Sequence, residues 1–120
     1  MRINKKQMRQ WIRALRSGKY SQSEGDLQNT KGYCCLGVAC KVLIPENKQI
    51  KDKKNRLEGA LPAGQPFAPD WLKAINTDVK DQTGRSLSFQ NDGKYMSFQQ
   101  IADLLEKLYL SNGVTNYEKL

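Results

Sequence analysis

Tyr33-Cys34-Cys35-Leu36-Gly37-Val38-Ala39-Cys40-Lys41-Val42-Leu43-Ile44 is the most apolar stretch of the 120-residue chain, and Pro45 ends it. Proline ends regular structure because it lacks a backbone N–H and its ring clashes with the preceding turn. The stretch predicts a short buried helix. A buried strand stays open as the alternative, because periodicity does not separate the two over so few residues.

Amphipathic helices are predicted on both sides of this segment. The first covers residues 4–16, with Asn4 as N-cap and the Ser17-Gly18 pair as its stop. The last begins at Ser97, which together with Gln100 fits a capping box. Apolar residues recur in both at three- and four-residue spacings, which places them on one face. They are Met8, Trp11, Ile12 and Leu15 in the first helix and Phe98, Ile101, Leu104, Leu105 and Leu108 in the last.

The segments between these helices complete the predicted fold. Residues 19–31 are polar and predict a loop or short hairpin, and a third helix is predicted from Pro69 through Val79. Leu87-Ser88-Phe89 alternates ahead of the turn residues 91–94, which predicts a short strand entering a tight turn. The fold class is therefore α+β, a mostly helical single domain with three to four helices and a small hairpin or sheet.

The predicted domain is compact over residues 1–110. A basic, extended surface excursion is expected at about 46–68, where Lys, Pro, Gly and Asn are frequent. The tail at 111–120 is expected to be weakly ordered, because little in it can be buried. No stretch approaches the ~20 apolar residues of a membrane helix, and no signal-peptide pattern opens the chain. We expect a cytoplasmic protein without membrane contact.

The chain contains no histidine, which excludes dyads that use histidine as general base and zinc sites with mixed cysteine and histidine ligands. Cys34, Cys35 and Cys40 lie within the apolar segment, so inert core packing is the favoured interpretation. A reactive thiol and a zinc site with a fourth, carboxylate ligand stay open as alternatives. We expect neither cofactor nor metal, and no catalysis.

Positive charge is concentrated in the N-terminal half of the chain. Residues 1–56 hold fourteen Lys and Arg against four Asp and Glu, a balance of +10, whereas residues 57–120 carry −2. On the first helix a cationic stripe forms beside the apolar one; it consists of Arg2, Lys5, Lys6, Arg9, Arg13 and Arg16. Such a surface favours an anionic partner, although excess charge also serves solubility alone.

One group of residues combines the chemistry of a nucleotide site. Guanidinium groups bind phosphate in a fork, aromatic faces stack on bases, and carboxamides read base edges. The predicted ligand-binding residues are Arg13, Arg16, Lys19, Tyr20, Gln22, Tyr33, Asn91 and Asp92. The competing explanations are a solvated charge stripe for the cations, core packing for the tyrosine, and local turn hydrogen bonds for Asn91 and Asp92.

The chain also resembles a widespread family of small bacteriophage and prophage proteins. The shared pattern runs W-x-x-A-L-R-S-G-x-Y-x-Q over residues 11–22, then Y-C-C-L-G-V-x-C over 33–40, L-P at 61–62, N-D at 91–92 and F-x-x-I-A-D-L-L over 98–105. Residues 46–60 lie outside this pattern, and the N-D block here lacks the preceding leucine. The resemblance implies a phage protein acting in an infected bacterial host, in host takeover or in blocking host defences.

These observations predict an accessory protein that binds and sequesters a small anionic ligand, most plausibly a nucleotide immune signal. Two alternatives stay open. The basic half would let the chain bind nucleic acid, or its surface would cover and inhibit a host enzyme. A homo-oligomer is expected, because short chains have few deep clefts of their own.

Overall fold

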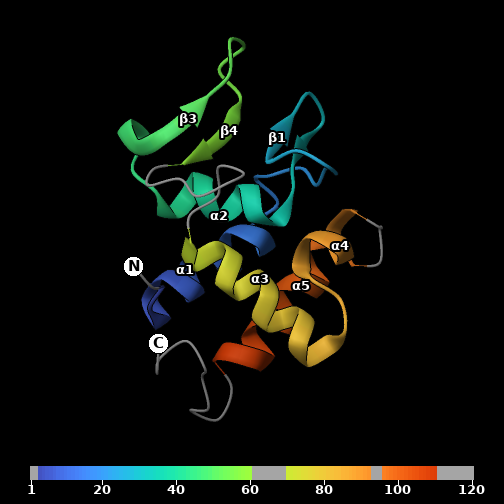
Figure 1. The fold of residues 1–120 in the computed structure, drawn as a ribbon. Coiled ribbons are helices and arrows are strands. Elements are labelled where there is room, and N and C mark those ends of the chain that lie inside the picture. Colours follow the sequence, from blue (N-terminus) through green and yellow to red (C-terminus); the bar gives the residue numbers. More distant parts are fainter. Residues whose placement is uncertain (1–2, 61–69, 93–95, 111–120) are drawn as a thin grey trace.

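The computed structural model describes residues 3–60, 70–92 and 96–110. In these ranges the chain forms helices and two small antiparallel sheets, so the α+β, mostly helical fold class is confirmed (Figure 1). The helices are α1 (Lys5–Arg16), α2 (Cys35–Leu43), the 3-10 turn η1 (Glu46–Lys48), α3 (Asp70–Thr83), α4 (Leu87–Asp92) and α5 (Phe98–Tyr109). The strands are β1 (Gln28–Asn29), β2 (Gly32–Tyr33), β3 (Gln49–Lys51) and β4 (Leu57–Ala60).

Helix α1 begins with the predicted cap. The Asn4 side chain accepts a hydrogen bond from the Gln7 backbone N–H at 2.8 Å, and the Gln7 side chain accepts one from the Asn4 N–H at 3.0 Å. The predicted apolar stripe is fully buried and packs against α2 and α5. The indole Nε1 of Trp11 donates to the Cys35 carbonyl at 3.1 Å, which joins α1 to the first turn of α2.

The apolar segment forms a helix, α2, so the strand alternative is wrong. Cys34 is its N-cap, and its sulfur accepts a hydrogen bond from the Gly37 N–H at 3.3 Å. One side of α2 lies against the backbone just before β1 so closely that a Cβ built on Gly37 would stand 1.9 Å from the Leu27 carbonyl oxygen. Glycine is therefore required here by the close approach of two backbones.

Both sheets are two-stranded antiparallel hairpins. The first, β1–β2, pairs Gln28 with Tyr33 at the end of the segment predicted to be a loop or hairpin. The second, β3–β4, occupies the part of the predicted surface excursion up to Ala60. That part packs against the rest of the chain more closely than expected, because Leu57 is buried and its N–H donates to the Gln28 side chain at 2.7 Å. The rest of the excursion and the tail at 111–120 lie outside the described residues.

The strand predicted at Leu87–Phe89 is wrong, because these residues open helix α4. The Ser86 hydroxyl accepts a hydrogen bond from the Phe89 N–H at 3.2 Å, and the Asn76 side chain accepts one from the Ser88 N–H at 3.0 Å. Both bonds satisfy amides at a helix start, which short alternation in the sequence does not reveal. Helix α4 therefore occupies the place of the predicted strand.

The capping box predicted for α5 is present, with Ser97 and Gln100 in reciprocal hydrogen bonds. At its other end the buried Tyr109 hydroxyl donates to Asp78 of α3 at 2.5 Å. Burial and this carboxylate raise the pKa of Tyr109 above its ordinary value. Within the described ranges, the helices are all too short or too polar to cross a membrane.

Substituting Gly37→Ala tests the close approach of α2 and the backbone at Leu27, just before β1. We expect a loss of at least about 3 kcal/mol in the free energy of unfolding, because the new methyl group meets backbone that cannot move aside. Urea denaturation measures it. Gly25→Ala is the control, with open space around the new Cβ and only the strain of a positive φ, about 1–2 kcal/mol. Equal losses in the two variants would contradict the packing.

Candidate functional site

A polar hollow of about 760 Å³ lies where the segment after α1, the β1–β2 hairpin, α4 and the start of α5 meet. Its size is within the range of small-molecule sites, about 300–1,000 Å³. The lining consists of Gln22, Ser23, Glu24, Asn29, Thr30, Lys31, Asn91, Met96, Ser97 and Gln100. It combines segments about 70 residues apart in the sequence, so only the folded chain has this site.

Asn91 joins the walls of the hollow and is only 1% exposed. Its Nδ2 donates to the Ser23 carbonyl at 2.8 Å and to Asp92 at 2.9 Å. Its Oδ1 accepts hydrogen bonds from Gln22 Nε2 at 2.9 Å and from the Cys35 N–H at 3.3 Å. All the hydrogen-bonding capacity of the amide is used inside the protein, so Asn91 shapes the hollow and offers no free group to a ligand.

Gln22 has a similar bridging role. Besides the bond to Asn91, its Nε2 donates to the Met96 carbonyl at 2.9 Å. Its Oε1 accepts from the Phe98 N–H at 3.1 Å, one of the amides that the first turn of α5 cannot satisfy by itself. Asp92 completes the connection, since its Oδ1 accepts from the Gly25 N–H at 3.0 Å. Three predicted site residues thus form one network, whose hydrogen bonds are internal.

Among the described lining residues, the groups with unused hydrogen-bonding capacity are others, namely Lys31, Thr30 and the Nε2 amide of Gln100. Lys31 and Thr30 are exposed at the turn of the β1–β2 hairpin, and neither side chain has a polar partner among the described residues. Gln100 uses only its Oε1, in the α5 capping box. In the described part of the lining, these three groups thus keep unused hydrogen-bond donors, one of them an ammonium group, and Glu24 adds a carboxylate that already interacts within the protein.

Arg13 and Arg16 lie elsewhere. They line a shallow groove of about 250 Å³ between α1 and α5, together with Arg9, Ile12, Glu106 and Leu110. Arg16 is paired with Asp103 at 2.6 Å and Glu106 at 3.2 Å, and its hydrogen bonds to these two carboxylates raise its pKa. This arginine connects α1 to α5, whereas Arg13 stays exposed.

The remaining predicted residues do not line the hollow either. Tyr20 and Tyr33 pack edge to face, with ring centroids 5.4 Å apart and planes at 88°, and both contact the core. Lys19 is exposed just after α1. Of the eight predicted residues, the structure brings Gln22 and Asn91 together in the hollow and Asp92 next to them. Lys31, Thr30 and Gln100 were missed, although the polar hairpin turn and the capping box were visible in the sequence.

The three cysteines are free thiols and are buried, as the core-packing interpretation predicted. Burial raises the pKa of Cys34 to about 11 and that of Cys40 to about 12, and it holds the pKa of Cys35 well above its ordinary value. A thiol nucleophile reacts as the thiolate, which this environment disfavours. In the described part of the chain, no three Cys, Asp or Glu side chains are grouped so that they would hold a metal ion.

Comparison with known proteins identifies a family that covers the N-terminal half of the chain. A family model described as "Domain of unknown function (DUF8296)" matches residues 3–62. No curated protein and no solved structure matches the chain. The matched range includes α1, both hairpins and α2, and with them the hollow's lining from Gln22 to Lys31. The lining from Asn91 to Gln100 lies beyond it.

Asn91→Ala tests whether the buried amide is structural. We expect a loss of about 2–4 kcal/mol in the free energy of unfolding, because several buried donors and acceptors lose their partner. Urea denaturation gives this value. As a comparison, Arg16→Gln removes a partly exposed ion-pair cluster and should cost no more than about 1 kcal/mol. An Asn91→Ala variant as stable as the native protein would contradict the structural role.

The raised thiol pKa values predict slow alkylation. At about pH 8, iodoacetamide should modify Cys34 and Cys40 at least ~100-fold more slowly in the native protein than in concentrated urea, since far less thiolate is present. These thiols contribute a pH-dependent stability that is fully present below about pH 9, the ordinary value, and is lost as pH rises toward 11–12. Peptide mass spectrometry reads the labelling, and fast labelling of any of the three would refute their burial.

Proposed function

The chain belongs to the family of the domain of unknown function (DUF8296), and we propose from its surface that it captures a small anionic ligand in the polar hollow and holds it without chemical change. The observation that carries this proposal is the set of unused donors in the hollow. Lys31 supplies an ammonium group, and Thr30 and Gln100 supply a hydroxyl and an amide. Such groups suit phosphate or carboxylate oxygens.

The lining also favours a ligand that carries hydroxyl groups besides its anionic group. Glu24, which already has an interaction within the protein, lies in the same lining, and its carboxylate has enough lone pairs to accept further hydrogen bonds. A ribose or other sugar would donate to it, while an anion without donors would be repelled. A nucleotide combines both requirements, with phosphate for Lys31 and sugar hydroxyls for Glu24.

Binding without turnover is supported by what the chain can supply chemically. It contains no histidine, the side chain most used for proton transfer near neutral pH. Its thiols are buried with raised pKa values. The resemblance to phage proteins supports a setting in which a phage accessory protein removes a nucleotide signal of host defence. Inhibition of a host enzyme by surface contact is the alternative that the ligand experiment distinguishes.

Calorimetry with adenosine monophosphate, adenosine, inorganic phosphate and cyclic dinucleotides tests the capture. We expect a phosphate-bearing nucleotide to bind with micromolar or tighter affinity, and Lys31→Gln to weaken it about tenfold or more, the typical loss for one charge-assisted contact. Arg13→Gln is the matched control, since it removes one exposed charge outside the hollow and should leave affinity within about twofold.

Two results would count against this function. If no member of the panel binds at micromolar concentration, the hollow is not a nucleotide site. If Arg13→Gln and Lys31→Gln weaken binding equally, the ligand responds to net charge or lies in the α1–α5 groove. Mass spectrometry of the ligand after long incubation tests the absence of turnover, because a changed mass would mean catalysis.

A further inference from the structure

We propose that α1 binds the phosphate backbone of nucleic acid through three exposed cations, Lys6, Arg9 and Arg13, here called the α1 ridge. This surface is separate from the hollow. The three residues occur at spacings of three and four along one helix, so they lie in a row about 10 Å long. All three are exposed, and none has an ion pair with another described residue.

The position of α1 explains why this row faces solvent. One flank of the helix packs on α5, where Arg16 is occupied by Asp103 and Glu106. The other flank adjoins the end of α2, where Gln10 Nε2 donates to the Val42 carbonyl at 3.1 Å. The ridge is the strip between these two contacts, and the fold leaves it uncovered by other described elements.

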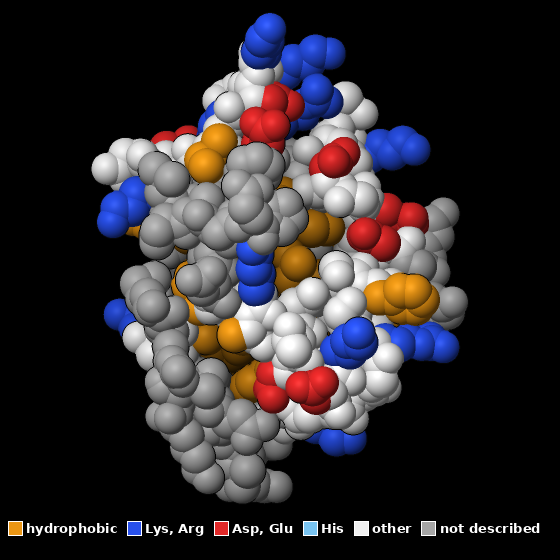
Figure 2. All heavy atoms as spheres, in the orientation of Figure 1, with side chains coloured by type: hydrophobic (Ala, Val, Ile, Leu, Met, Phe, Trp, Pro, Cys, Tyr) orange, Lys and Arg blue, Asp and Glu red, His pale blue; other side chains and the backbone are white. Residues whose placement is uncertain are grey.

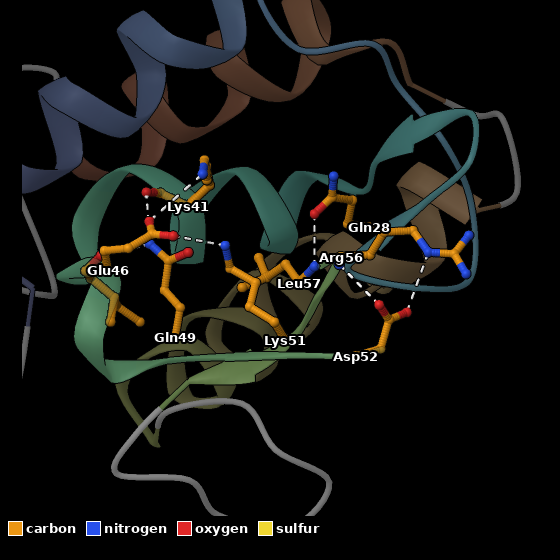
Figure 3. A network of polar contacts seen from close by, with 9 residues as sticks. Gln28, Lys41, Glu46, Gln49, Lys51, Asp52, Arg56 and Leu57 are labelled. Carbon is orange, nitrogen blue, oxygen red and sulfur yellow. Dashed lines mark hydrogen bonds and ion pairs between the residues drawn. The ribbon is translucent and has the colours of Figure 1, made fainter. Parts of the chain in front are cut away.

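In the second basic region, the β3–β4 hairpin, some cations have carboxylate partners, whereas Lys48, Lys53 and Lys54 have no ion pair with another described residue. These three lie in the 3-10 turn η1 and in the hairpin turn, not in a row along one helix face. Glu46 lies between Lys41 and Lys51, with oxygen–nitrogen distances of 3.8 and 2.8 Å, and Asp52 pairs with Arg56 at 3.2 Å (Figure 3). Asp52 also holds the hairpin turn by accepting from the Lys54 and Arg56 N–H groups.

The surface view agrees with this distinction. Figure 2 shows Lys and Arg side chains gathered at the far end of the β3–β4 hairpin, with acidic side chains directly beside them. Part of the positive field there is cancelled locally, whereas Lys6, Arg9 and Arg13 of α1 have no carboxylate ion pair among the described residues. The α1 ridge is therefore a set of uncompensated cations in a row along one helix, whereas the uncompensated cations of the hairpin region lie in turns.

The chemistry of the ridge fits phosphate better than an acidic protein. Duplex DNA carries a phosphate for each 3.4 Å of axis on each strand, so a 10 Å row of cations matches about three successive phosphates. Arginine binds phosphate oxygens in a bidentate fork. The exposed strip of α1 carries no apolar or aromatic side chain, which a protein interface usually needs at its centre. Without base-reading groups, binding should depend little on sequence.

Fluorescence anisotropy with a labelled DNA duplex and a single-stranded RNA tests the ridge. We expect Arg9→Gln/Arg13→Gln to weaken binding of either nucleic acid about tenfold or more at low salt. For the duplex, the slope of log affinity against log salt should fall by about 1.8, since each lost phosphate contact contributes about 0.9. The two probes also show which nucleic acid is preferred.

Lys73→Gln/Lys80→Gln on α3 is the matched control, because it removes the same charge from another helix. It should change affinity less than about threefold and leave the slope nearly unchanged. Equal losses in the two double variants, or no nucleic-acid binding by the native protein, would overturn the proposal. Binding of an acidic protein in place of nucleic acid would do so as well. Nucleotide capture in the hollow should survive Arg9→Gln/Arg13→Gln, so the two proposals fail independently.

Discussion

The buried amide of Asn91 is the constraint on which the arrangement of the chain depends. It contacts the segment after α1 at Ser23 and Gln22, the first turn of α2 at Cys35, and its own neighbour Asp92. A buried amide that lost these partners would be strongly unfavourable, so the segments that provide them are held in one relative position. This single side chain therefore joins the walls of the hollow and fixes them relative to one another.

The sequence predicted the parts of the fold that depend on local chemistry. Capping boxes at Asn4 and Ser97 and the apolar periodicity of α1, α3 and α5 are properties of short segments, and the helices begin where those caps place them. Helix α4 was missed because its start is satisfied by Asn76 from another helix. The β3–β4 hairpin was missed because Leu57, isolated among polar residues, gave no alternating pattern, although it is buried.

The candidate site was less predictable because its hydrogen bonds join residues that are far apart in the sequence. Residue types show what a side chain can bond to, but they do not show which groups the fold has already paired. Arg16, Gln22 and Asp92 have the chemistry of ligand-binding groups, yet each satisfies backbone or carboxylate groups far away in the sequence. Lys31 was not predicted as a ligand-binding residue because it is a lone cation in a turn. It becomes significant only because the start of α5 is folded opposite it around the same hollow.

The positive charge of this chain is not concentrated in the lining of its hollow. Among the described residues, the lining of the hollow has one Lys and one Glu, so these side chains attract an anion only weakly, while the net charge of +8 belongs to the whole chain. A field of that sign concentrates anions around the protein over a distance of about 10 Å at physiological salt. Selection among those anions then depends on short-range hydrogen bonds, which act only at contact. Under the proposed capture function, a basic body with a nearly neutral hollow would gather many anions and retain those whose donors and acceptors match.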